Sequence, residues 1–290
     1  MKTIFVTGGT GNNGKPILET LAQTDFSVKA LLRDPSKAVV QAANIRYIQG
    51  DMDDVASLEK ALEDVHSAFL VTAYSESFPL QHKRFIEAAK KVGVKHIVQL
   101  SGIGADPKAE ILTAKWLGEA EQHLMSSGLN WTILRAGSFT NNFFANAESI
   151  AKEGIIAAPY GPSGEAPLSI IDNRDIGAVA AKILTEAEDH KDKIYHLTGN
   201  THLNYKQIAG LFTKVLNKTI TYQSVTDSDA KNELLQWQVP ELVADSLVEL
   251  WASIRNSKTP PPITDDVERI LGRKPKTFEQ FIRDHSKTFS

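Results

Sequence analysis

The sequence lacks cysteine altogether, which excludes disulfides, thiolate chemistry, iron–sulfur clusters and cysteine-ligated zinc. It also lacks any apolar run of about 18 residues, the length that a membrane-spanning helix requires. The opening Met1-Lys2-Thr3 leads directly into a strand-like segment, without the apolar stretch of a secretory leader. From these absences we expect a cytoplasmic protein that has no membrane partner.

Neither sign of charge dominates the chain. Lysine plus arginine total 32 and aspartate plus glutamate total 35, so the formal net charge is −3. A dedicated nucleic-acid binder would carry a basic patch, and we therefore expect no nucleic-acid partner. The eight histidines include no H-x-H or H-E-x-x-H spacing, so we predict no metal site. A G-x-S-x-G turn for a serine nucleophile is absent as well.

Short apolar runs alternate with amphipathic segments through the first 135 residues. Such alternation requires right-handed crossovers and predicts an α/β fold with a doubly wound parallel sheet of the Rossmann type. The expected strands are 4–6, 27–32, 45–49, 68–72, 96–100 and 131–134. One expected helix follows the glycine-rich turn after the first strand. The other expected helices cover about 35–43, 54–64, 80–92 and 110–127.

The second half of the chain changes in character, with a stretch rich in glycine, proline and alanine at 154–164. We expect a dinucleotide-binding domain over 1–135 and a smaller α/β subdomain over 136–290. The smaller subdomain should pack on the substrate side of the sheet, and some of its segments are free to return to the main sheet. Further elements are expected at 172–185, 194–197, 229–256 and from 277 onward.

The strongest signal is a glycine-rich turn between the first strand and the first helix. Gly8, Gly11 and Gly14 form the pattern G-x-x-G-x-x-G in the context that a dinucleotide site requires. The first glycine permits a tight turn, the second lets a pyrophosphate approach, and the third allows close helix–strand packing. The helix N-terminus adds N–H groups and a positive dipole for the phosphates. The predicted cofactor-binding residues here are Gly8, Thr10, Gly11, Asn12, Asn13 and Gly14.

The end of the second strand indicates which dinucleotide is preferred. An acidic residue at this place would bond the ribose 2′-OH of NAD, whereas an arginine accommodates the 2′-phosphate of NADP. Arg33 stands there, and Lys37 follows within one helical turn. We therefore predict that NADP(H) is preferred over NAD(H). Asp34 leaves two alternatives open, because it could pair with Arg33 or belong to a turn before Pro35.

The sequence resembles the NmrA-like branch of the atypical short-chain dehydrogenases over nearly its whole length. The resemblance is carried by Val6–Gly14, Leu32–Pro35, Gly50-Asp51, Gly93–Val98 and Trp131–Arg135. That branch includes NADPH-dependent reductases of quinones, azo dyes and triphenylmethane dyes. It also includes NADP(H)-sensing regulators without established turnover, so the resemblance implies the cofactor more firmly than the activity.

The resemblance also implies further cofactor contacts at the strand ends. Asp51 and Met52 would lie beside the adenine, and Thr72 and Ala73 would line the ribose and pyrophosphate. Ser101 and Gly102 would approach the nicotinamide, which the loop 136–139 would border. Asn142, with Asn141, resembles the asparagine often found beside the substrate pocket. Ordinary polar groups at strand ends are the alternative for Thr72 and Ser101.

The chain departs from many short-chain dehydrogenases in its catalytic signature, because no alignment yields the tyrosine of Tyr-x-x-x-Lys. The spacing from Glu121 to Arg135 matches extended relatives, but it puts Leu117 at the lysine position and Thr113 at the tyrosine position. Shifting by two residues instead makes Lys115 the lysine and leaves Ile111 in place of the tyrosine. Lys115 is thus the one candidate catalytic group, and a surface pair with Glu119 is its alternative role.

Aromatic side chains are the candidates for a substrate-pocket wall, with the alternative that most belong to the core. The predicted pocket residues are Tyr74, Trp116, Phe139, Asn142, Phe143 and Tyr160. Such a pocket suits a flat electron-poor acceptor, whose reduction needs proximity and little water rather than a strong general acid. We expect an NADPH-dependent oxidoreductase acting on a small molecule such as a quinone or azo dye, as a monomer or homodimer. A non-catalytic NADP(H)-sensing regulator that binds a partner protein is the alternative.

Overall fold

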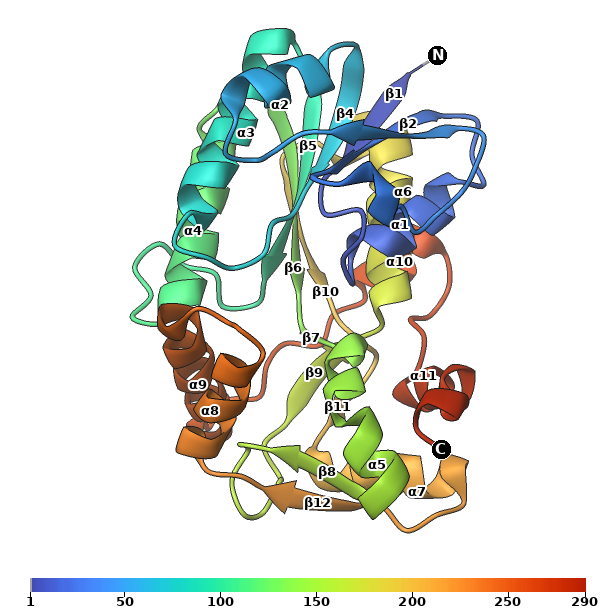
Figure 1. The fold of residues 1–290 in the computed structure, drawn as a ribbon, viewed down its shortest axis with the longest axis vertical. Helices are drawn as coiled ribbons and strands as arrows, with labels where there is room; N and C mark the ends of the chain where they lie inside the picture. The colour runs from blue at the N-terminus through green and yellow to red at the C-terminus, as the bar shows by residue number, and fades with distance from the viewer. Residues whose placement is uncertain (1) are drawn as a thin grey trace.

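A computed structural model describes residues 2–290 and contains a central sheet of seven parallel strands in the order β10-β6-β5-β4-β1-β2-β3 (Figure 1). This arrangement confirms the predicted doubly wound fold. The strand order reverses between β1 and β4, and ligands of open α/β sheets bind in the crevice at the carboxyl ends beside such a reversal. The strands are β1 (Thr3–Val6), β2 (Ser27–Leu32), β3 (Ile45–Gln49), β4 (Val65–Leu70), β5 (His96–Gly102), β6 (Asn130–Ala136) and β10 (Lys193–Leu197).

Helices cover both faces of this sheet, as Figure 1 shows. One face packs against α1 (Gly14–Leu21), α6 (Asn173–Thr185) and α10 (Asp266–Leu271). The other packs against α2 (Val55–Leu62), α3 (Phe78–Val92) and α4 (Leu112–Met125). Neighbouring strand residues point to opposite faces, so Val98 belongs to the first apolar core and Ile97 to the second. Burial on both faces explains why the strands read as continuous apolar runs.

The remaining elements form a second lobe below the carboxyl ends of the main strands (Figure 1). Its own core is rich in phenylalanine, with Phe143, Phe212, Phe281 and Phe289 all buried. Its strands are β7 (Ser138–Phe139), β8 (Ile155–Ala158), β9 (Leu168–Ile171), β11 (His202–Leu203) and β12 (Thr221–Ser224). Its helices are η2 (Thr140–Asn146), α5 (Ala147–Glu153), α7 (Tyr205–Leu216), α8 (Asp227–Gln236), α9 (Glu241–Asn256), α11 (Phe278–Asp284) and η4 (Ser286–Thr288).

The two lobes do not divide at a single point in the chain. After entering the second lobe at residue 138, the chain returns to the main sheet with α6, the short η3 (Ala187–His190) and β10, which pairs in register with β6. None of the helices within residues 2–290 is long and apolar enough to cross a membrane.

Two predicted helices were wrong in part. Residues 35–43 contain only a short 3-10 turn, η1 (Pro35–Lys37), because tertiary bonds hold the rest outside a helix: the N–H of Val40 donates to the Tyr47 hydroxyl at 3.0 Å. The segment 229–256 is broken into α8 and α9, since Gln238 adopts a left-handed φ of 60° and Pro240 follows. In addition, β4 ends at Leu70, so Thr72 lies in the loop beyond the strand.

Candidate functional site

The glycine turn connects β1 directly to α1. Gly8 has a left-handed φ of 64°, and its carbonyl accepts a hydrogen bond from Gly11 N–H at 2.9 Å. A Cβ atom at Gly14 would lie 2.1 Å from the Gly8 oxygen, so only glycine permits this approach of α1 to the turn. The Thr7 hydroxyl donates to Val71 O and accepts from Val71 N–H, both at 2.8 Å, which fastens the turn to the end of β4.

The other predicted cofactor residues follow the neighbouring strands at the same edge of the sheet. Asp51 and Met52 come after β3, and Met52 packs partly into the core beneath α2. Thr72 and Ala73 come after β4, where the Thr72 hydroxyl is buried without a hydrogen-bond partner among residues 2–290. The structure therefore brings these strand ends together around the glycine turn, while their contacts with a cofactor stay predictions.

Arg33 and Lys37 are both exposed beyond the end of β2. Asp34 does not pair with Arg33 within the described part of the chain. Its carboxylate instead accepts from the Ser36 N–H at 3.0 Å and the Ser36 hydroxyl at 2.6 Å, which lowers the pKa of Asp34. Of the two alternatives for Asp34, the turn before Pro35 is the one observed, and the Arg33 guanidinium is left facing solvent.

A polar network joins α4 to the ends of β5 and β6. The Glu121 side chain, 2% exposed, accepts from Arg135 Nε at 3.0 Å and from a terminal Arg135 nitrogen at 2.5 Å. The same carboxylate accepts the Ser101 hydroxyl at 2.5 Å. This bonding raises the pKa of Arg135 above its ordinary value. The Ser101 hydroxyl thus bonds Glu121. This matches its alternative role as an ordinary polar group at a strand end, and its contact with a cofactor stays a prediction.

The residues of both alignments lie at the start of α4. Leu117 lies beside Gly102, where a Cβ would come within 3.2 Å of a Leu117 methyl carbon. Thr113 is buried beneath α9, and its N–H donates to the Ser246 hydroxyl at 2.9 Å. Lys115 is exposed, with its Nζ 4.0 Å from a Glu119 carboxylate oxygen. The structure therefore favours the surface pair for Lys115, and its catalytic role stays a prediction.

The predicted aromatic pocket divides into two groups. Tyr74 and Trp116 flank Phe78, with ring centroids 5.3 and 6.3 Å from it, in a cluster between α3, α4 and α9. Burial raises the pKa of Tyr74 to about 12, so its hydroxyl stays protonated near neutral pH.

Phe143 and Tyr160 form part of the second-lobe core, where Phe143 packs edge-on to Phe278 at 4.8 Å and Tyr160 stacks on Tyr205 at 4.8 Å. Their placement matches the alternative of core packing. Phe139 is half-buried against the main core, and Asn142 is exposed on η2.

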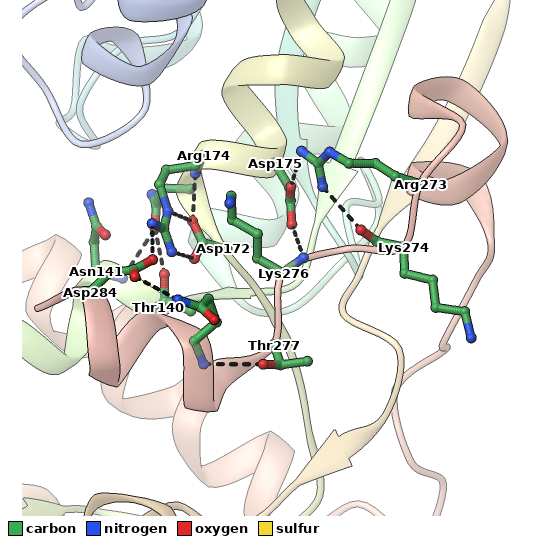
Figure 2. A network of polar contacts seen from close by, with 12 residues as sticks. Thr140, Asn141, Asp172, Arg174, Asp175, Arg273, Lys274, Lys276, Thr277 and Asp284 are labelled. Atoms are coloured by element: carbon green, nitrogen blue, oxygen red, sulfur yellow. Dashed lines mark hydrogen bonds and ion pairs between the residues drawn. The ribbon is translucent and has the colours of Figure 1, made fainter. Parts of the chain in front are cut away.

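Sequence reasoning missed the first turn of α6, which several segments share. Figure 2 shows Arg174 between two carboxylates, Asp172 at 2.6 Å and Asp284 of α11 at 2.5 Å. Asp175 is fully buried and accepts from Arg273 at 2.7 Å and from the Lys276 N–H at 2.6 Å. The sequence showed Asp172 only as a cap, because the partners of this turn lie about 100 residues away: they are separated by 98, 101 and 110 positions.

Two surface hollows lie away from this edge. One of about 450 Å³ is bordered by the end of α6, η3, β10 and α10, and includes Lys182, Tyr195 and Arg269. The other, of about 350 Å³, surrounds the amino ends of β1 and β4. The candidate site therefore rests on the strand ends and the glycine turn, not on either hollow.

Comparison with known proteins gives matches along nearly the whole chain. Residues 1–282 match the NmrA-like family. The chain is 33% identical to an NAD(P)H azoreductase of Xenophilus azovorans over 291 residues, which cover 99% of both chains. It is 32% identical to quinone oxidoreductase 2 of Escherichia coli over 251 residues, or 85% of this chain and 86% of the relative.

Solved structures show the same likeness. An NADPH complex of the NADPH-dependent quinone oxidoreductase of Escherichia coli superposes with a TM-score of 0.84 at 28% identity, covering 99% of this chain and 100% of the other. A triphenylmethane reductase of Citrobacter sp. has the same fold, with a TM-score of 0.83 at 24% identity over 98% and 99% of the two chains.

Proposed function

Since the chain belongs to the NmrA-like family, we propose that it is an NADPH-dependent reductase of flat, electron-poor acceptors such as quinones or azo dyes. The chain is an NAD(P)H-dependent oxidoreductase, like the azoreductase and the quinone oxidoreductase that it resembles along most of its length. The single observation that carries the finer proposal is a glycine turn in which position 14 admits only glycine, beside an α4 where neither alignment of the Tyr-x-x-x-Lys pattern supplies the tyrosine.

The glycine turn fits the diphosphate of a dinucleotide. Gly14 and Gly8 meet without side chains between them, so the N–H groups that open α1 stay accessible to phosphate oxygens. The first turn of α1 contains no acidic residue that would repel an anion. Arg33 and Lys37 would meet a 2′-phosphate, which argues for NADPH over NADH. The bound cofactor supplies a hydride from its nicotinamide C4.

The protein's part in the reaction is to hold the acceptor close and dry rather than to donate a proton. Leu117, which stands at the lysine position in one of the two alignments, presents a methyl group beside Gly102. Tyr74, with a pKa raised to about 12, stays neutral and can shape an apolar wall together with Trp116. Reduction of a quinone suits such a site, because the charge of the hydroquinone anion is delocalised and solvent can protonate it.

The test is to mix the purified protein with NADPH and a panel of quinones and azo dyes, and to follow the nicotinamide absorbance band. We expect oxidation of NADPH that depends on one of these acceptors and is absent without protein. Tight NADPH binding with no oxidation by any of them would contradict the reductase proposal and favour a sensing role instead.

A further inference from the structure

Asn173, the first residue of α6, is a buried amide that is bonded at both ends. The residue is only 1% exposed. The Nδ2 group donates to Asn13 Oδ1 at 2.8 Å and, over a longer 3.4 Å, to the Asn12 carbonyl. The Oδ1 atom accepts from the Asn141 N–H at 3.1 Å and lies 3.4 Å from the Thr140 hydroxyl.

These partners come from two distant parts of the chain. Asn12 and Asn13 belong to the glycine turn, where the cofactor diphosphate is proposed to bind. Thr140 and Asn141 open η2, next to the loop that would border the nicotinamide and the acceptor. Asn173 and Asn13 are 160 positions apart in the sequence, yet the Asn173 side chain bonds both the glycine turn and the start of η2.

The surroundings of Asn173 leave it little freedom. Four residues further along α6, a Cβ at Gly177 would lie 2.7 Å from the backbone carbon of Pro16, so α6 and α1 are in close contact. On either side of Asn173, Asp172 and Arg174 are joined to each other and to α11 (Figure 2). Asn13 also makes no side-chain cap for its own helix, which leaves its oxygen committed to Asn173.

We propose that Asn173 is a positioning residue that couples the glycine turn to the start of η2, so that ordering of the turn by a bound diphosphate also orders the segment beside the acceptor. The coupling follows from geometry: the rigid amide of Asn173 cannot follow a movement of Asn13 without disturbing its bond to Asn141. The inference rests on the proposed cofactor site but requires no turnover.

Hydrogen exchange with ADP as the probe tests this coupling. ADP carries the diphosphate and adenosine but lacks the nicotinamide half, so it can occupy the glycine turn without reaching residues 138–146. In the parent protein we expect ADP to slow amide exchange both in residues 8–14 and in 138–146. In Asn173→Asp the second effect should disappear, because a carboxylate keeps the acceptor for Asn141 and loses the donor to Asn13.

A matched variant separates coupling from general loss of stability. Asn44→Asp removes an amide that donates to the carbonyls of Leu21, Thr24 and Phe26 at 2.9, 2.9 and 3.1 Å, far from the carboxyl ends of the strands. It should lower the melting temperature yet preserve the ADP effect at 138–146. If Asn173→Asp does not fold, Asn13→Ala removes the same bond from the loop side and should abolish the same effect.

Two results would overturn the inference in distinguishable ways. Slowed exchange at 8–14 with no effect at 138–146 in the parent, or an unchanged effect at 138–146 in Asn173→Asp, would refute the coupling and leave the cofactor site intact. No ADP effect at 8–14 in the parent would refute the cofactor site itself. We further expect the ADP dissociation constant to rise roughly three- to tenfold in Asn173→Asp, the scale of one lost hydrogen bond.

Discussion

Glu121 lies beneath Arg135 and bonds its guanidinium through both carboxylate oxygens, at 3.0 and 2.5 Å. The carboxylate is almost fully buried, whereas a quarter of the arginine side chain reaches solvent. The pair therefore ties α4 to the end of β6 from inside the protein, at the edge where the candidate site lies.

Glu121→Gln should destabilise the fold by roughly 2 kcal/mol, between the effects typical of exposed and buried ion pairs. The reason is that the Arg135 side chain, three quarters buried, loses its charged partner. Glu119→Gln is the matched control, because its pair with Lys115 at 4.0 Å is exposed and should change stability by less than about 0.5 kcal/mol. Urea unfolding measures both. Equal losses would mean that the buried pair contributes no more than a surface one.

Gly14→Ala should weaken NADPH binding by at least about tenfold, equivalent to 1.4 kcal/mol. The added methyl group would lie 2.1 Å from the Gly8 oxygen and must push α1 away from the turn. Gly210→Ala in α7 meets no atom within 4 Å and should instead raise stability by up to about 1 kcal/mol, because alanine favours helix. Fluorescence titration of NADPH, paired with thermal unfolding, checks both variants; unaltered NADPH affinity in Gly14→Ala would place the diphosphate elsewhere.

Arg33→Ser tests the cofactor preference. Charge-assisted hydrogen bonds contribute about 1.5–3 kcal/mol each, so the parent should prefer NADPH over NADH by roughly tenfold to a few hundredfold. The variant should lose most of this preference by binding NADPH more weakly, with NADH affinity almost unchanged. Arg46→Ser, an exposed arginine in β3, serves as the control and should keep the preference. Equal affinities in the parent would show that Arg33 is merely a solvated side chain.

Lys115→Ala should leave quinone reduction within a few-fold of the parent rate. The Lys115 ammonium is exposed beside Glu119, so its removal should affect only a surface pair. Steady-state kinetics with a quinone acceptor provide the measurement. A loss of about 100-fold or more, the scale of a removed general acid, would identify Lys115 as catalytic after all.

Stability should fall as the pH drops from about 6.5 to 4, partly because of His82. Burial lowers the pKa of this histidine to about 4 in the folded protein, against 6.5 for an ordinary histidine. Between these values the unfolded chain binds the extra proton and the folded one does not, so stability is complete above 6.5 and is lost on acidification.

The loss from His82 has a limiting slope of about 1.4 kcal/mol per pH unit. His82→Gln should flatten the stability curve in this pH window, as urea unfolding at several pH values would show. A curve parallel to that of the parent would mean that His82 is protonated in the native state.

Local signals were sufficient for most of the main sheet and for the glycine turn. The inner parallel strands, such as β1, β4 and β5, are buried on both faces, and Gly14 stands where only glycine can pack, so a short stretch of sequence contains the information. The helix expected at 35–43 failed because its residues are held by partners elsewhere: Tyr47 binds Val40, and Asp34 turns the chain at Ser36. Neither interaction has a periodic pattern.

The missing parts of the site are long-range by nature. Ser246 reaches Thr113 across 133 positions, and Asn173 reaches Asn13 across 160. An asparagine at the start of a helix is indistinguishable, in one sequence, from an ordinary capping residue. Phe143 and Tyr160 were equally ambiguous, because an aromatic residue near a site has the same sequence signature whether it faces a ligand or a core.

The return of β10 to the side of β6 constrains when the protein can fold during synthesis. The strand ends at Leu197, and α6, which covers the apolar side of α1, ends only twelve residues earlier at Thr185. A nascent chain that has emerged only as far as β6 therefore lacks both the strand that pairs with β6 and the helix that packs against α1. We therefore expect the main sheet to be completed only after α6 and β10 have been synthesised, and the shorter nascent chain to be the form most prone to aggregation.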